Sequence, residues 1–174
     1  RMQFDDVFHK NGFRAIHAIG GGGIVPELAK IGCYEDGNFL KRAQLVPMMY
    51  HGRALSSNGA LPLLVDPENI GPISDYRVPQ ALRHKGAIYY SNDLAECVDR
   101  GVVIESMEGE GGQSLMELEI RTFGVTLPMD LLIRRINFLK DPGKKIVMGQ
   151  LDYHIWQMGR KAPGKHHYTH TAAY

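Results

Sequence analysis

The sequence has no long hydrophobic run, only two cysteines and almost no net charge. No segment reaches the ~18 apolar residues that a membrane span needs, and none has the apolar core of a secretory signal. Cys33 and Cys97 lie far apart and form no motif, which is typical of reduced, buried thiols in an intracellular protein. We therefore expect no membrane span and a cytoplasmic or mitochondrial location.

The charge balance argues against a nucleic-acid polymer as the main partner. The 20 basic and 19 acidic side chains leave a net charge of +1, so there is no global basic field. Eight histidines and a local basic cluster remain as contacts. His166, His167 and His170 have part of the spacing of a metal site, but no cysteine or carboxylate lies nearby in the sequence. We expect no metal and no cofactor.

What the chain does contain is typical of an ordinary folded domain. Its 174 residues are 44% hydrophobic and 22% charged, which is close to the average of soluble globular proteins. We expect a single domain over residues 1–174. The glycine run at residues 20–23 lacks the lysine and hydroxyl of a phosphate loop, so we interpret it as a turn.

Helical patterns cover most of the length, so the expected class is mainly α with at most a small β element. Helices are expected from residue 26 and over residues 39–55, 78–85, 92–98, 127–139 and 146–160. Residues 56–74 are rich in Ser, Gly, Pro and Asn and predict a loop. Pro47 must kink its helix or set its boundary.

Two further segments have a distinct hydrophobic pattern, and the pattern of the first allows either a strand or a helix. The stretch from Met116 to Arg121 alternates strictly, which favours a strand, although a helix can also hold these residues. The helix after Thr126 is predicted to have one apolar face, formed by the side chains Leu127, Leu131, Ile136 and Leu139.

The candidate catalytic and binding residues lie mainly in two segments that begin with Asp-Tyr. Asp75 follows a long loop and precedes a helix start, where a carboxylate can project into a cleft or simply cap the helix. Asp152 lies within a predicted helix, where it needs a partner or solvent. Tyr153 and Trp156 can stack on a planar base or belong to the core.

Lys41 and Arg42 form a third candidate. Adjacent residues point in different directions on a helix, so one of them can face a pocket while the other pairs with a carboxylate or phosphate. The alternative is a pair of surface cations.

The order of these segments resembles that of the queuosine salvage protein family, in its C-terminal half. The resemblance rests on the segments Phe39-Leu40-Lys41-Arg42-Ala43-Gln44, Asp75-Tyr76-Arg77-Val78-Pro79-Gln80 and Leu151-Asp152-Tyr153 with Trp156, followed by a basic and aromatic tail. Residues 82–94 and 117–121 support it, and the match is collinear over residues 39–174.

The resemblance implies a helical fold related to DNA glycosylases and the hydrolysis of the N-glycosidic bond of queuosine 5′-monophosphate. This reaction releases queuine for reuse in tRNA. By resemblance, Asp75 is the catalytic aspartate and Lys41 is a pocket lysine needed for activity. The expected substrate-binding positions are Tyr76, Asp152, Tyr153, Trp156, Ile73 and Gln157.

The chemistry fits these implied roles. Cleavage builds positive charge on the ribose, which an ionised carboxylate such as Asp75 can stabilise. Queuine is a 7-deazapurine and lacks the N7 that purine hydrolases often protonate, so electrostatics around the sugar matter more. Lys41 can meet the phosphate or act on Asp75 through its charge.

The sequence also departs from the family. Members of the family are about twice as long, so the resemblance implies a missing N-terminal half that carries a pocket histidine. Ile73 replaces an aromatic residue that stacks on the base, and Gln157 replaces a carboxylate. These departures favour an alternative function, namely a non-catalytic family member that serves as a structural subunit of a larger, mitochondrial complex. A protein partner would then cover the surface of the missing half.

Overall fold

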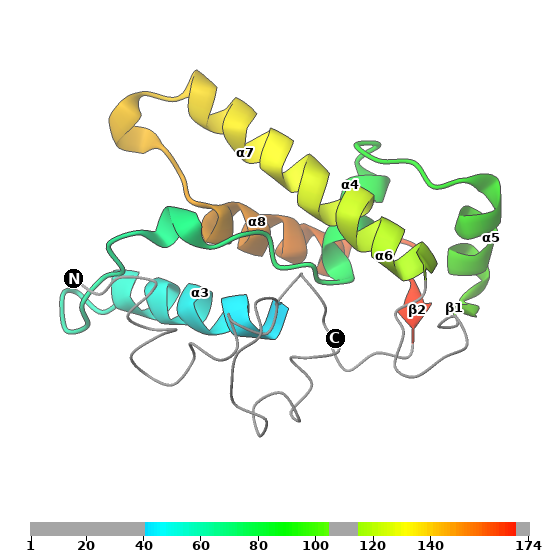
Figure 1. The fold of residues 1–174 in the computed structure, drawn as a ribbon, viewed down its shortest axis with the longest axis horizontal. Helices are drawn as coiled ribbons and strands as arrows, with labels where there is room; N and C mark the ends of the chain where they lie inside the picture. The colour runs from blue at the N-terminus through cyan, green and yellow to red at the C-terminus, as the bar shows by residue number, and fades with distance from the viewer. Residues whose placement is uncertain (1–40, 105–114, 170–174) are drawn as a thin grey trace. The chain divides into compact units, whose positions relative to one another are not determined.

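The computed structural model describes residues 41–104 and 115–169, and most of the regular structure in them is helical (Figure 1). This confirms the predicted mainly-α class. These residues fall into two compact units. Among the described residues, the first unit contains 41–73 and Val147–Gly149, and the second contains 74–104, 115–146 and 150–169. The predicted turn and helix in residues 20–40 lie outside the described residues, as does Cys33.

The first unit is built on α3 (Lys41–Leu55), which runs through Pro47 without ending there. The boundary interpretation of Pro47 is therefore wrong, and this ring is fully buried. The following loop returns to the helix through two hydrogen bonds. The Gly71 amide donates to Gln44 Oε1 at 2.5 Å, and the Tyr50 hydroxyl donates to the Pro62 carbonyl at 2.8 Å. A short 3₁₀ turn, Pro67–Asn69, interrupts the predicted loop.

The second unit begins with two short helices whose ends follow from the sequence. α4 spans Arg77–His84 and α5 spans Asn92–Arg100. Ser91 caps α5, because its hydroxyl accepts the amide of Leu94 at 3.4 Å. Gly101 ends α5 in the left-handed region at φ 73°, which favours glycine. Cys97 on α5 is a free, half-buried thiol.

The segment that alternates in sequence forms a helix, α6 (Leu115–Arg121), and the strand interpretation is wrong. A π-helical turn, Thr122–Thr126, joins it to α7 (Leu127–Leu139), so that the two helices continue as one rod in Figure 1. The Thr126 hydroxyl donates to the Arg121 carbonyl at 3.0 Å across this turn. Gly124 faces Pro79 of α4 there, which packs the turn against that helix.

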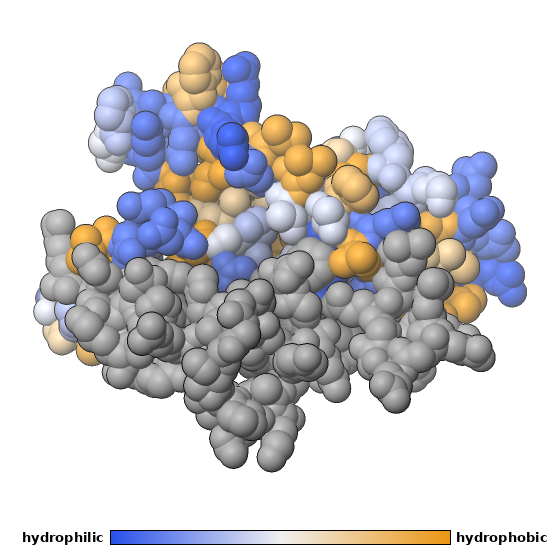
Figure 2. Space-filling model, viewed as in Figure 1, coloured by the Kyte–Doolittle hydropathy of each residue, from blue (hydrophilic) through white to orange (hydrophobic). Residues whose placement is uncertain are grey.

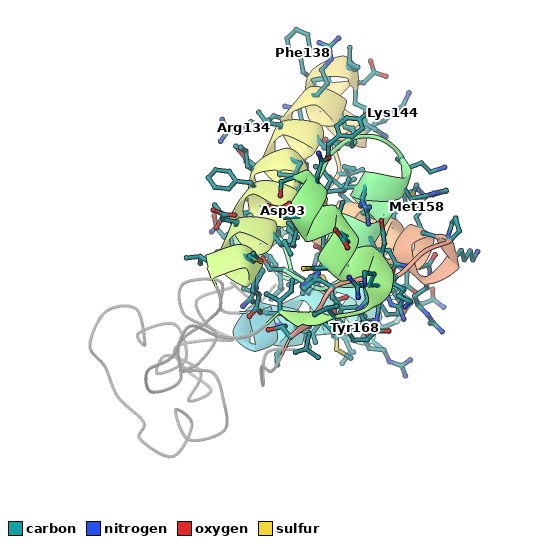
Figure 3. The ribbon with its side chains drawn as sticks, turned by 90° about the vertical axis from the view of Figure 1, so that its right-hand side faces the viewer. Asp93, Arg134, Phe138, Lys144, Met158 and Tyr168 are labelled. Carbon is teal, nitrogen blue, oxygen red and sulfur yellow. The ribbon has the colours of Figure 1, made fainter. Side chains whose placement is uncertain are left out.

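The predicted apolar face of α7 is not a core face. Leu127, Leu131 and Leu139 are 48%, 59% and 66% exposed, Ile136 is half-buried, and Met129 is fully buried. Figure 2 shows apolar side chains along this rod at the surface. In Figure 3, Phe138 projects from the far end of the same helix. A helix can therefore be amphipathic in sequence and still leave its leucines in solvent.

After the 3₁₀ turn Pro142–Lys144, α8 (Met148–Lys161) carries the second Asp-Tyr segment. Two-residue strands, β1 (Val103–Ile104) and β2 (Tyr168–Thr169), form a parallel pair that aligns Val103 with Tyr168 and Ile104 with Thr169. The small β element is therefore present, and it ties the end of the described chain to the residues after α5. The core beside it is formed by Leu94, Val98, Ile104 and Ile120.

Candidate functional site

Asp75 lies at the start of α4, where the sequence predicts it, and its side chain is held in place. The Arg77 amide donates to Asp75 Oδ1 at 2.8 Å, and the Val78 amide donates to the Asp75 carbonyl at 3.1 Å. The side chain of Asp75 therefore accepts from the amide of the first residue of α4, while the N-cap position itself is Tyr76. The same bond fixes the orientation of a half-buried carboxylate.

Tyr76 is fixed by contacts with residues on both sides of the sequence. Its ring lies 4.3 Å from the ring of His166, centroid to centroid, and 5.0 Å from the guanidinium carbon of Arg77. Arg77 is itself held by Gln80, whose Oε1 accepts from Arg77 Nη1 at 2.9 Å. The Asp-Tyr pair therefore sits on a first helical turn whose polar groups are ordered by neighbouring side chains.

Gly159 of α8 lies directly against this first turn. A Cβ atom at residue 159 would collide with the backbone carbonyl of Arg77. Only a glycine permits this approach, because any side chain would push α8 away from the residues that follow Asp75. Gly159 is not predictable from the sequence, since a glycine inside a helical pattern has no sign that distinguishes close packing from a weak helix position.

The predicted substrate residues on α8 divide between two faces of that helix. Asp152 is buried at 2% exposure and lies two turns before Gly159, on the same face. Tyr153 is 54% exposed and stacks with Trp156 at 6.0 Å and 19° between the ring planes. The guanidinium carbon of Arg160 lies 5.1 Å from the Trp156 ring.

The exposed Tyr153, the half-buried Trp156 and the exposed Arg160 stack in series, and stacked aromatic rings of this kind can bind planar rings. Gln157 is exposed as well. The buried Asp152 belongs to a different environment, where a carboxylate is retained only with partners. The substrate roles of all four α8 residues stay predictions.

Lys41 and Ile73 belong to the first unit. Lys41 is the first residue of α3 and only 6% exposed, which excludes the interpretation of this lysine as a surface cation. Ile73 is 2% exposed. The pairing of Lys41 with Asp75 or with a phosphate stays a prediction.

A buried polar cluster that the sequence analysis missed lies in the second unit. Glu117 and Arg121 of α6 are 1% and 0% exposed, and Oε1 of the acid lies 4.0 Å from Nη1 of the arginine. The Thr169 hydroxyl of β2 donates to Glu117 Oε2 at 3.2 Å. The spacing of four between acid and base was a signal for an ion pair along a helix. The strand interpretation gave no reason to single out this ion pair, because it placed Glu119, which is exposed, on the same face as Glu117.

His167 connects this cluster with Asp75 electrostatically. Burial is the main cause that lowers the pKa of His167 to about 4; the positive charges of His166 and Arg121 act in the same direction, and the Asp75 carboxylate opposes them. The ring of His167 is therefore neutral at pH 7. The charges of Asp75 and Arg121 both affect the pKa of this one ring, so the catalytic candidate Asp75 and the buried Glu117–Arg121 cluster both lie within electrostatic range of His167.

In residues 41–104 and 115–169, no three His, Cys, Asp or Glu side chains gather as they would around a metal ion. No helix in the same residues is both long and apolar enough to cross a bilayer. The ring of His166 contacts Tyr76, and the pKa of His167 is affected by the charge of Arg121.

The fold and the site define a mainly helical protein whose carboxylates and aromatic rings lie at the start of α4 and along α8. The chain matches the family described as queuosine salvage protein over residues 33–174, and it belongs to that family. The match supports a role in queuosine salvage and a nucleotide-related substrate. A search of curated proteins found no significant match to this chain.

Proposed function

We propose that this chain hydrolyses the N-glycosidic bond of queuosine 5′-monophosphate and releases queuine. The observation that carries the proposal is the fixed carboxylate of Asp75, held through the Arg77 amide at 2.8 Å beside an immobilised tyrosine ring. Membership in the queuosine salvage family supports the choice of substrate.

In the proposed reaction the bond between the ribose and the base breaks, and its electron pair leaves with the base. Positive charge then develops on the ribose, and the negative charge of Asp75 stabilises it. A water molecule supplies the hydroxyl to the sugar and a proton to the base, which leaves ribose 5-phosphate and queuine. The carboxylate needs no reorganisation during this step, because its orientation is already set by the helix start.

The other residues have supporting roles in this proposal. Tyr153 and Trp156 hold the planar base. Lys41, in the first unit, keeps the role that the family resemblance implies, that of a lysine needed for activity.

The experiment that tests the proposal incubates the purified chain with queuosine 5′-monophosphate and measures free queuine together with the remaining nucleotide. Asp75→Asn is the decisive variant, because its amide oxygen can still accept the Arg77 amide while the negative charge is lost. Asp141→Asn, at an exposed acid paired with Lys144, is the matched control. We expect release by the wild type and by the control, and a loss of at least ~100-fold in Asp75→Asn.

One observation favours a second function, that of a non-catalytic subunit. α7 exposes apolar side chains such as Leu131 and Phe138, at 59% and 79%, and surfaces of this kind are often covered by a partner. A folded chain that neither binds the nucleotide nor releases queuine would support this function and contradict the glycosylase.

A further inference from the structure

The segment of residues 162–169, which we name the C-terminal clasp, is attached to four elements of the second unit. Gln80 Nε2 of α4 donates to the Gly164 carbonyl at 2.9 Å. The Lys165 ammonium donates to the carbonyl of Arg100, at the end of α5, at 3.1 Å. A cation at this position also interacts favourably with the dipole of α5.

The clasp continues into β2, which pairs with β1 and binds α6 through the hydrogen bond from Thr169 to Glu117. Figure 3 places Tyr168 near the end of α5, in agreement with these contacts. The clasp is therefore held independently at α4, α5, β1 and α6. A segment held at so many points is rigid enough to position another residue.

The residue that the clasp positions is Tyr76. The ring of His166 lies 4.3 Å from the Tyr76 ring and 4.6 Å from the Tyr168 ring, so the three rings form a continuous series. His166 Nδ1 lies 2.8 Å from the His167 carbonyl. Since a carbonyl only accepts, Nδ1 carries the proton and donates, and this bond fixes the plane of the imidazole.

We infer that His166 is a positioning residue for the reaction, which holds Asp75 in its productive orientation through Tyr76. The ring contact restrains Tyr76, and the peptide that joins Tyr76 to Arg77 carries the amide that binds Asp75 Oδ1. This role rests on the proposed function. A loss of the ring allows the helix start to move, and a displacement of about 1 Å at a reacting group can cost about 100-fold in rate.

The test measures kcat and KM for queuine release in His166→Ala and His166→Phe. We expect kcat to fall about 10–100-fold in His166→Ala with KM changed less than about threefold, because the interaction acts on the orientation of a group needed in the transition state. His166→Phe keeps a ring against Tyr76 and should recover most of kcat. His154→Ala, at an exposed histidine of α8, is the control and should behave as the wild type.

A double-mutant cycle with Tyr76→Leu tests whether His166 acts through Tyr76. If it does, the combined variant loses little more activity than either single variant. Additive losses, a change confined to KM, or full activity of His166→Ala would each overturn the inference.

A second measurement separates this inference from the proposed function. Amide hydrogen exchange at Arg77 reports directly on the bond to Asp75 Oδ1 and needs no substrate. We expect exchange at this amide to accelerate at least about tenfold in His166→Ala and to return toward the wild-type rate in His166→Phe. If the wild type releases no queuine, the proposed function fails. The exchange rates at the Arg77 amide then still test whether His166 restrains the bond to Asp75. Unchanged exchange in His166→Ala overturns it.

Discussion

Two ion pairs of identical spacing lie on either side of the π-helical turn in the α6–α7 rod. On α6, Glu117 and Arg121 are 1% and 0% exposed and 4.0 Å apart. On α7, Asp130 and Arg134 are 42% and 76% exposed and only 2.9 Å apart. The shorter pair lies in solvent, where such contacts contribute about 0.2–1 kcal/mol. The longer pair lies in the interior, where breaking it leaves an uncompensated charge. Distance alone does not rank the two pairs, because burial decides the cost of losing a partner.

The largest expected effect comes from breaking the buried pair. Arg121→Ala should lower the free energy of unfolding by about 3–5 kcal/mol, whereas Arg134→Ala should lower it by less than about 1 kcal/mol. Urea unfolding followed by circular dichroism measures both. Equal effects of the two variants would contradict the comparison.

The next effect concerns the pH dependence of stability that the burial of His167 imposes. Its pKa is about 4 in the folded chain and 6.5 in the unfolded chain, with burial as the main cause. The contribution of neutral His167 to the free energy of unfolding is therefore fully present above pH 6.5. It falls as the pH drops toward 4, because the unfolded chain takes up the proton first. The loss amounts to roughly 3 kcal/mol.

Urea midpoints measured at several pH values between 7.5 and 4 test this dependence. His167→Gln should lose this part of the slope, while His154→Gln, at an exposed ring, should keep it. A slope that persists in His167→Gln would assign the dependence to other groups.

The smallest expected effect lies on the exposed face of α7. Leu131→Gln should change the free energy of unfolding by less than about 0.5 kcal/mol, since this side chain is 59% exposed. Met129→Ala, two residues earlier and fully buried, should cost about 2–5 kcal/mol. Thermal unfolding of the two variants compares the faces directly. A large loss in Leu131→Gln would show that this face is covered in solution.

The sequence predicted most of the described helices because their ends carry clear local signals, such as Ser91 before α5 and the Asp141-Pro142-Gly143 stop after α7. It could not decide between helix and strand for α6, because six alternating residues satisfy both periods. It also could not predict that the leucines of α7 are exposed. A period of 3.6 identifies a face, but only the packing of other elements determines whether that face is buried.

The candidate site was predictable only in part for the same reason. Asp75 and Tyr76 stand at a helix start that proline, loop composition and spacing all mark. Gly159 and His166 contribute through contacts with residues about 80 and 90 positions away in the sequence, and no local pattern encodes such a pairing. Arg121 was visible as a charged residue, but its complete burial depends on β2 and the neighbouring helices.

The π-helical turn at Thr122–Thr126 fixes the angular phase between the two halves of the rod. Each residue of an α-helix advances the side-chain direction by about 100°, and a π-turn is typically a single-turn insertion into an otherwise regular helix. If the same residues continued as a regular α-helix, the extra residue would rotate every position of α7 by about that angle. Met129 would leave the interior and a different set of side chains would replace it. The π-helical form of this turn therefore selects which face of α7 the protein presents, without any change in the composition of the helix.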